Sequence, residues 1–185
     1  MLDILTEAFM DDRVVRWLFP DEGDRRRLQP LFHGAMLTHP NHEAHLIGQF
    51  GGASIWLTLA GGQSPFPEPP EKPGPDLAAT FGDNAGRFWE LGRLMLGRHP
   101  TGQAHVDLPS MGVVPGRQGS GLGSAVLRHQ LDRADDGLPA YLEASSPRSR
   151  ALYLRHGFDD LGEPVQLPDG PRVWPMWRQP QEQTR

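Results

Sequence analysis

The chain has 185 residues, of which 37% are hydrophobic and 22% are charged, and its formal net charge is -5. This length and composition fit one globular domain with its own core and exclude a fibrous or disordered chain. The negative charge argues against a nucleic-acid partner, and the lack of cysteine excludes disulfides, thiolate metal sites and cysteine nucleophiles.

The N-terminus carries Asp3 and Glu7 where a signal peptide has a basic region. No apolar run approaches the roughly 20 residues of a membrane span. We therefore expect a cytoplasmic protein with no membrane partner.

Two short helices are predicted between residues 2 and 19, with a break near Asp11 and Asp12. The large aromatic side chains of this segment are interpreted mainly as core anchors, with substrate contact as the alternative: Phe9, Trp17 and Phe19.

A longer amphipathic helix is predicted from residue 24 to 39, ended by Pro40. Its apolar face is expected to consist of Leu28, Leu31, Phe32, Ala35 and Met36. The compact basic run Arg25, Arg26 and Arg27 is interpreted as its solvated face. His39, His42 and His45 raise the possibility of a metal site, but Pro40 breaks the helix, so the rings need not share a face, and no metal is expected.

The runs EAHLIGQF and ASIWLTLA predict an antiparallel hairpin around Gly51 and Gly52. The proline-rich segment 61–75 predicts a semi-rigid loop, either a tolerated insertion or one wall of an acceptor cleft. A helix that ends near Gly97 is predicted next.

A strand is predicted from Ala104 to Leu108, with His105 and Asp107 on one face. Pro109 follows, and a proline in a central strand indicates a bulge near 109–112. Such a bulge separates this strand from the next and leaves main-chain groups unpaired.

The run MGVVPGRQGSGLGSAVL, residues 111–127, predicts a strand, a glycine loop and a helix. Without a Cβ, glycines let a phosphate approach the main chain, and the first amides of the helix lack intrahelical partners. Gly123 is expected to let this helix lie close to the sheet. A strand, AYLEAS, and a short helix follow; Ser146 and Pro147 begin that helix and Gly157 ends it.

Residues 104–158 resemble the acetyl-coenzyme A binding core of the GCN5-related N-acetyltransferase superfamily. Gln118, Gly121 and Gly123 match its signature positions and Tyr153 matches its tyrosine. The resemblance implies a mixed α/β (α+β) fold with a mostly antiparallel central sheet flanked by helices. It also implies one domain, 1–185, with acceptor-side helices and early strands in 1–100 and a C-terminal hairpin in 159–180.

The resemblance implies that the backbone of Met111, Gly112 and Val113 pairs with pantetheine. It implies diphosphate contacts from the loop and helix start, namely Gln118, Gly119, Ser120, Gly121, Leu122, Gly123 and Ser124. Ser149 stands near the position where the family often has asparagine and is a weaker cofactor contact.

Tyr153 is the expected general acid, with a core tyrosine as the alternative. Glu143 leads as general base, ahead of His105 and Asp107, although a structural ion pair for Glu143 fits the sequence equally well.

The implied activity is acetyl transfer from acetyl-coenzyme A, without a metal, to an amine of a small molecule or peptide. A different acyl group fits equally. A non-catalytic coenzyme A sensor and a dinucleotide-binding oxidoreductase stay open; the latter fits Glu143 at about 20 residues past the glycines but leaves Tyr153 unexplained. A hairpin around Pro168, Asp169 and Gly170 would close the acceptor site or form a homodimer contact.

Overall fold

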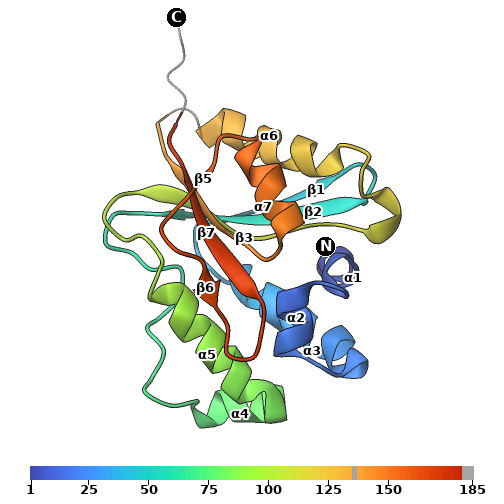
Figure 1. Ribbon diagram of the computed structural model, residues 1–185, viewed down its shortest axis with the longest axis vertical. Helices are drawn as coiled ribbons and strands as arrows, with labels where there is room; N and C mark the ends of the chain where they lie inside the picture. Colours follow the sequence, from blue (N-terminus) through green and yellow to red (C-terminus); the bar gives the residue numbers. More distant parts are fainter. Residues whose placement is uncertain (135–136, 181–185) are drawn as a thin grey trace, which may run out of the picture.

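The computed structural model describes residues 1–134 and 137–180. In this part of the chain a seven-stranded sheet has the order β1-β2-β3-β4-β7-β5, and β6 pairs with β7 off this path (Figure 1). β3 and β4 are parallel and the other pairs are antiparallel, which confirms the expected mixed, mostly antiparallel sheet. The strands are β1 (His42–Ile47), β2 (Gly52–Leu59), β3 (His105–Val113), β4 (Ala140–Ala144), β5 (Asp159–Asp160), β6 (Val165–Gln166) and β7 (Arg172–Arg178).

Helices cover both faces of the sheet. α6 and α7 pack on one face and lie together in the upper part of Figure 1, whereas α1 to α5 lie below them in that view. The predicted helix pair with a break at Asp12, the hairpin and the helix ending at Gly97 are confirmed; α4 was not predicted. The helices are α1 (Leu2–Phe9), α2 (Arg13–Leu18), α3 (Glu22–Met36), α4 (Pro75–Phe81), α5 (Ala85–Leu96), α6 (Leu122–Ala134) and α7 (Pro147–Leu154).

The core divides between these faces. Beneath α6 and α7, Leu127 and Tyr153 pack with Leu108 and Leu142 of the central strands. On the opposite face, α2, α3, α4 and α5 share a second cluster with Leu167 and Val173, and α1 packs on β2 through a third. The proline-rich segment is a loop, as predicted, since it holds no helix or strand before α4.

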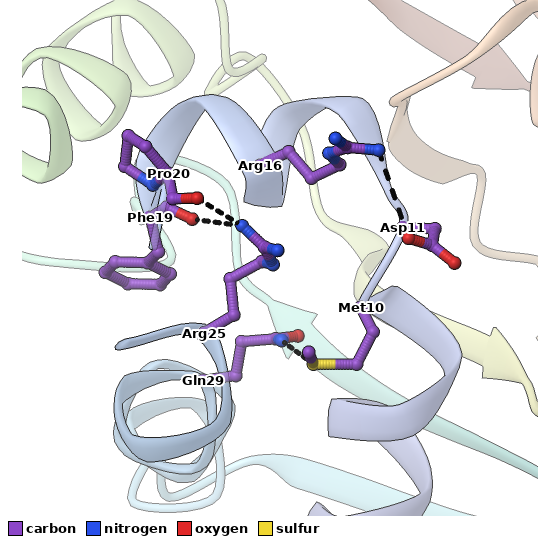
Figure 2. Close-up of polar contacts among 7 residues, drawn as sticks. All are labelled: Met10, Asp11, Arg16, Phe19, Pro20, Arg25 and Gln29. Carbon is purple, nitrogen blue, oxygen red and sulfur yellow. Dashed lines mark hydrogen bonds and ion pairs between the residues drawn. The ribbon is translucent and has the colours of Figure 1, made fainter. Parts of the chain in front are cut away.

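The interpretation of Arg25 as a solvated residue was wrong. Its side chain is buried, and its Nη1 donates to the carbonyl oxygens of Phe19 (2.9 Å) and Pro20 (2.7 Å) (Figure 2). These carbonyls lie between α2 and α3, where a buried acceptor needs a donor. The helix is therefore rotated from the predicted face, and Leu31 is 49% exposed. Arg26 and Arg27 do form surface ion pairs, with acidic residues of their own helix.

Candidate active site

An opening between β3 and β4 is the centre of the site. Two residues of β3, Leu108 and Pro109, stand opposite the single residue Trp56 of β2, which confirms the predicted bulge. Pairing between β3 and β4 covers Val106 to Leu108 and then stops. The two strands separate beyond the bulge.

Main-chain groups of β3 face this opening. Val114 N donates to Gly51 O at 3.0 Å and Gly112 pairs with Ala53, so by alternation the main chain of Met111 and Val113 points away from β2. Gly112 has a packing role as well, because a Cβ there would lie 2.6 Å from the Cβ of Ala8 in α1.

Gln118 fastens the following loop to the strand. Its Nε2 donates to Val113 O at 3.1 Å, and its Oε1 accepts from Arg148 Nη1 at 2.9 Å. The amide of this one side chain therefore links the loop both to β3 and to Arg148 of α7.

The loop ends in a row of exposed amides at the start of α6. The first helical hydrogen bond runs from Ala125 N to Gly121 O (3.0 Å), and within the described residues no amide from Gly119 to Ser124 donates to a protein acceptor. Gly119 and Gly121 have φ values of 79° and 84°, and a Cβ on either would meet no atom within 4 Å. This cradle, residues 119–124, is open to a ligand and suits an anion.

The side chains of the cradle have structural contacts of their own. Ser120 Oγ donates to Arg117 O at 2.6 Å, and Ser124 Oγ lies 2.9 Å from His156 Nε2. Leu122 packs against the β1–β2 turn. A Cβ on Gly123 would lie 3.3 Å from Leu152, so Gly123 admits α7 beside α6, and the expectation that it brings α6 close to the sheet is corrected.

Positive charge lies at the helix end of the cradle, around His156, which contacts Ser124. Burial lowers the pKa of His156, and Arg128 and Arg155 lower it further, so several cationic side chains lie around this ring. Such a field attracts an anionic ligand such as a diphosphate.

Tyr153 is held by a well-defined helix, α7. Ser146 and Ser149 form a capping box at its start, and at its end Phe158 N donates to Tyr153 O while Gly157 N donates to Leu154 O, with Gly157 at φ 81°. The predicted boundaries are confirmed. The Ser149 hydroxyl is engaged in the box, where it also donates to Ser146 O at 2.9 Å.

The ring of Tyr153 is buried against Phe158, with 5.9 Å between centroids. Burial raises the pKa of the Tyr153 hydroxyl, and the nearby Asp12 carboxylate raises it further. Within the described residues this hydroxyl has no hydrogen-bond partner. It is a protonated donor with nothing yet to donate to.

Asp12 is a candidate that the sequence reading did not identify. Its Oδ1 accepts from the amides of Val14 (2.8 Å) and Val15 (3.1 Å), and its Oδ2 accepts from Ser145 Oγ (2.6 Å) directly after β4. Burial nevertheless raises the pKa of this carboxyl. In the sequence, Asp12 could be recognised only as the residue that caps the second of two short helices. That position indicates local structure but not the contact with Ser145.

Glu143 and Tyr153 are not brought into contact. Leu142 and Ala144 of β4 pack in the Tyr153 cluster, whereas Tyr141 and Glu143 project to the opposite face. There the Tyr141 hydroxyl donates to Glu143 Oε1 at 2.8 Å. Burial raises the pKa of Glu143 to about 7, with a further contribution from the Asp107 carboxylate.

The sequence-based candidates His105 and Asp107 gather on this same face. Both are buried, and His99 Nε2 lies 3.7 Å from Asp107 Oδ2. Burial lowers the pKa of His105, whose Nδ1 contacts Gln103 O at 2.9 Å. His99 was not a candidate because its loop position gives no periodic signal.

A hollow of about 140 Å³ opens next to Asp12, beyond the end of β4. Residues from three distant segments line it: Arg13, Ser145, Pro147, Pro171, Arg172 and Trp174. The N-terminal helices and the C-terminal hairpin were both expected on the acceptor side, whereas the segment directly after β4 was not. The tryptophans of that hairpin, Trp174 and Trp177, are half-buried.

The other sequence motifs do not join the site. His42 is exposed, His39 is half-buried, and His45 Nε2 bonds Gln130 Oε1 at 3.1 Å. Within residues 1–134 and 137–180, no three histidine or acidic side chains are grouped as a metal ion would require. Nor is any helix of that part of the chain long and apolar enough to cross a bilayer.

No family model matches the sequence. Among solved structures, the chain is similar to "histone acetyltransferase HPA2 and related acetyltransferase" from Corynebacterium glutamicum, at 29% identity over 100% of this chain and 91% of that chain, with a TM-score of 0.66. It shares its fold with arylalkylamine N-acetyltransferase 2 of Aedes aegypti (15% identity, 97% and 93% coverage, TM-score 0.68). It also shares it with a Drosophila melanogaster polyamine N-acetyltransferase (13% identity, 96% and 91% coverage, TM-score 0.59).

Proposed function

We propose that this chain, whose structure matches the GCN5-related N-acetyltransferase superfamily, transfers an acetyl group from acetyl-coenzyme A to an amine of a small molecule or peptide. The observation that carries the proposal is the row of amides from Gly119 to Ser124 beside the opening between β3 and β4. A diphosphate joined to a polar, extended arm needs these two features next to each other.

The residues present fit both parts of that ligand. The cradle amides and the positive field around His156 would hold the diphosphate, with Gln118 fixing the loop. The main chain of Met111 and Val113 would pair with the amides of the arm, as an added strand would. Ser149 would contact the ligand only by giving up part of its capping box.

Acetyl-coenzyme A, when bound, supplies the acetyl group as a thioester. The Val113 N–H points into the opening and would stabilise negative charge on an oxygen placed there. Tyr153 keeps its proton through neutral pH because its pKa is raised, and its hydroxyl would donate that proton to a leaving sulfur. Its buried position keeps water from competing for the proton.

Glu143 is the proposed base. A carboxylate whose pKa is raised to about 7 can accept a proton from an ammonium near neutral pH more readily than an ordinary glutamate. Acid and base would then act from opposite faces of the same opening. Asp12 is the rival base, because it lies on the Tyr153 side and its pKa is also raised.

The first test is binding. Acetyl-coenzyme A at a hundred times its Kd should stabilise the protein by about 2.7 kcal/mol, and NADH should not. Gly121→Val, which places a side chain on the cradle at a positive φ, should abolish this stabilisation. Gly116→Ala in the same loop, where a Cβ meets no atom within 4 Å and φ is not positive, is the matched control.

The second test is turnover, followed as free thiol released with a panel of amines. Thiol release that depends on an amine supports the enzyme. Tight binding of acetyl-coenzyme A without release for any amine would favour the non-catalytic sensor. Stabilisation by NADH instead would favour an oxidoreductase and remove the proposal.

A further inference from the structure

The hollow beyond β4 has an unusual charge for a site that receives an amine. Arg13 and Arg172 both line it, and within the described residues neither pairs with a carboxylate. Among residues 1–134 and 137–180, the one polar contact of the Arg172 side chain is a 3.3 Å bond from Nε to the neutral Gln166 Oε1. A protonated amine alone would be repelled by these two guanidinium groups.

The walls of the hollow are fixed to one another. Trp17 Nε1 of α2 donates to Pro168 O at 2.8 Å, and a Cβ on Gly170 would lie 2.5 Å from the Trp17 ring. The β6–β7 turn therefore packs directly on α2. This contact fixes the position of Arg13, at the start of α2, relative to Arg172, after the turn. Trp174 adds an aromatic wall that packs on the core holding Tyr153.

The hollow also connects to the proposed chemistry. Ser145 lines the hollow, and its hydroxyl donates to Asp12. The Asp12 carboxylate is close enough to Tyr153 to raise the pKa of the Tyr153 hydroxyl. A ligand here would meet the positive charge of Arg13 and Arg172 and the hydroxyl of Ser145, which is bonded to the Asp12 carboxylate.

We propose that the acceptor carries an anionic group, a carboxylate or a phosphate, which Arg13 and Arg172 bind while its amine points toward Asp12 and the opening between β3 and β4. Arginine suits this task because its planar fork donates paired hydrogen bonds to such groups. A volume of about 140 Å³ admits the anionic head and a short chain, so the acceptor is a compact amino acid or aminoalkyl phosphate.

This inference rests on the proposed acetyl transfer, and its test separates the two. γ-Aminobutyrate, butylamine and putrescine share a four-carbon frame and differ in the distal group, while phosphoethanolamine supplies the phosphate arm. Thiol release gives kcat/KM for each, and calorimetry with coenzyme A present gives the Kd of each amine without turnover.

For the wild-type protein we expect the anionic amines to be preferred over butylamine, with putrescine the poorest. Arg13→Gln with Arg172→Gln should reduce that preference at least tenfold in kcat/KM and weaken γ-aminobutyrate binding by a similar factor. Arg13→Glu should shift preference toward putrescine. Arg16→Gln is the matched control, because Arg16 lies on the same helix but is exposed, does not line the hollow and lies 4.0 Å from Asp11.

The proposal is overturned if butylamine or putrescine matches the anionic amines, if the double variant leaves the preference unchanged, or if neither anionic amine binds. Acetyl transfer itself survives each of these three results. It fails separately, if acetyl-coenzyme A does not bind or if no amine releases thiol.

Discussion

The two faces of the central sheet differ in what they bury. The face under α6 and α7 is mainly apolar, and among the described residues it buries Tyr153 and also Arg178, whose Nε donates to His156 O. The face under α1 to α5 instead buries a polar cluster of His99, His105, Asp107 and Tyr141, with Glu143 half-buried beside them.

Burial acts on both faces in ways that suit opposite roles. It raises the pKa of Tyr153, so this hydroxyl stays protonated, and it raises the pKa of Glu143 to about 7, so this carboxyl is poised near neutrality. Because β4 lies between them, the two groups cannot simply exchange a proton with each other. With acid and base kept apart, the base can take a proton from the attacking amine while the acid gives a different proton to the leaving sulfur.

The largest effect should come from Tyr153→Phe. Without the hydroxyl the leaving sulfur has no acid in a buried site, so kcat should fall by about a hundredfold or more. The Kd for acetyl-coenzyme A should stay within about twofold, because the ring and its packing are retained. Steady-state kinetics and calorimetry together measure this split.

The chain has a second tyrosine that serves as the control on the opposite face. Tyr141→Phe removes the hydrogen bond that lowers the pKa of Glu143, so it should move the pH dependence of the rate upward and cost less than about tenfold in kcat. Equal losses from the two substitutions, or no loss from Tyr153→Phe, would refute the assignment of the acid.

Glu143→Gln should give the next largest effect. As a base, Glu143 must be ionised, so the wild-type rate should rise as the pH passes through about 7. The variant should lose this rise of the rate with pH, and its rate should be about tenfold to a hundredfold lower. Asp12→Asn is the comparison. If Asp12→Asn removes the rise and Glu143→Gln does not, the base is Asp12.

Glu143→Gln should lower the rate but raise the stability of the protein. The pKa of Glu143 is raised by folding from 4.5 to about 7, so its protonated form contributes stability below about pH 4.5 that is lost as pH rises through 7. Glutamine escapes this loss. The variant should therefore gain Tm relative to wild type between pH 5 and 8, and a Tm difference independent of pH would contradict the buried position.

The sequence predicted the half of the molecule where local rules suffice. The bulge followed from Pro109, the cradle from the glycines and α7 from Ser146, Pro147 and Gly157, each of which limits its own backbone. These features depend on neighbours along the chain, so they can be read without the fold.

Contacts between distant segments could not be predicted in this way. The approach of Asp12 to Ser145 spans 133 positions, and Trp17 reaches Pro168 across 151. Arg25 was misread because its acceptors, the carbonyls of Phe19 and Pro20, become buried only when α2 and α3 fold together. No periodicity in the sequence encodes that need.

Gly112→Ala tests the packing of α1 on the sheet face that buries the polar cluster. A Cβ at this position would lie 2.6 Å from Ala8 Cβ and 3.1 Å from Phe9, so α1 must shift. Overpacking of this kind should cost about 1 to 3 kcal/mol in the free energy of unfolding. Denaturant unfolding measures it, with Gly102→Ala, where a Cβ meets no atom within 4 Å, as the control; equal stability of the two variants would contradict the contact with α1.

The smallest effect concerns Ser149 on the α7 side. Its hydroxyl accepts from Ser146 N and donates to Ser146 O, so Ser149→Ala should lose about 1 kcal/mol through the capping box. Were Ser149 chiefly a cofactor contact, the same change would instead weaken coenzyme A binding and leave stability alone. Ser146→Ala separates these outcomes, because Ser146 caps the same helix through its own hydroxyl. If both variants lose stability and only Ser149→Ala loses affinity, the hydroxyl serves the helix in the free protein and the ligand in the complex.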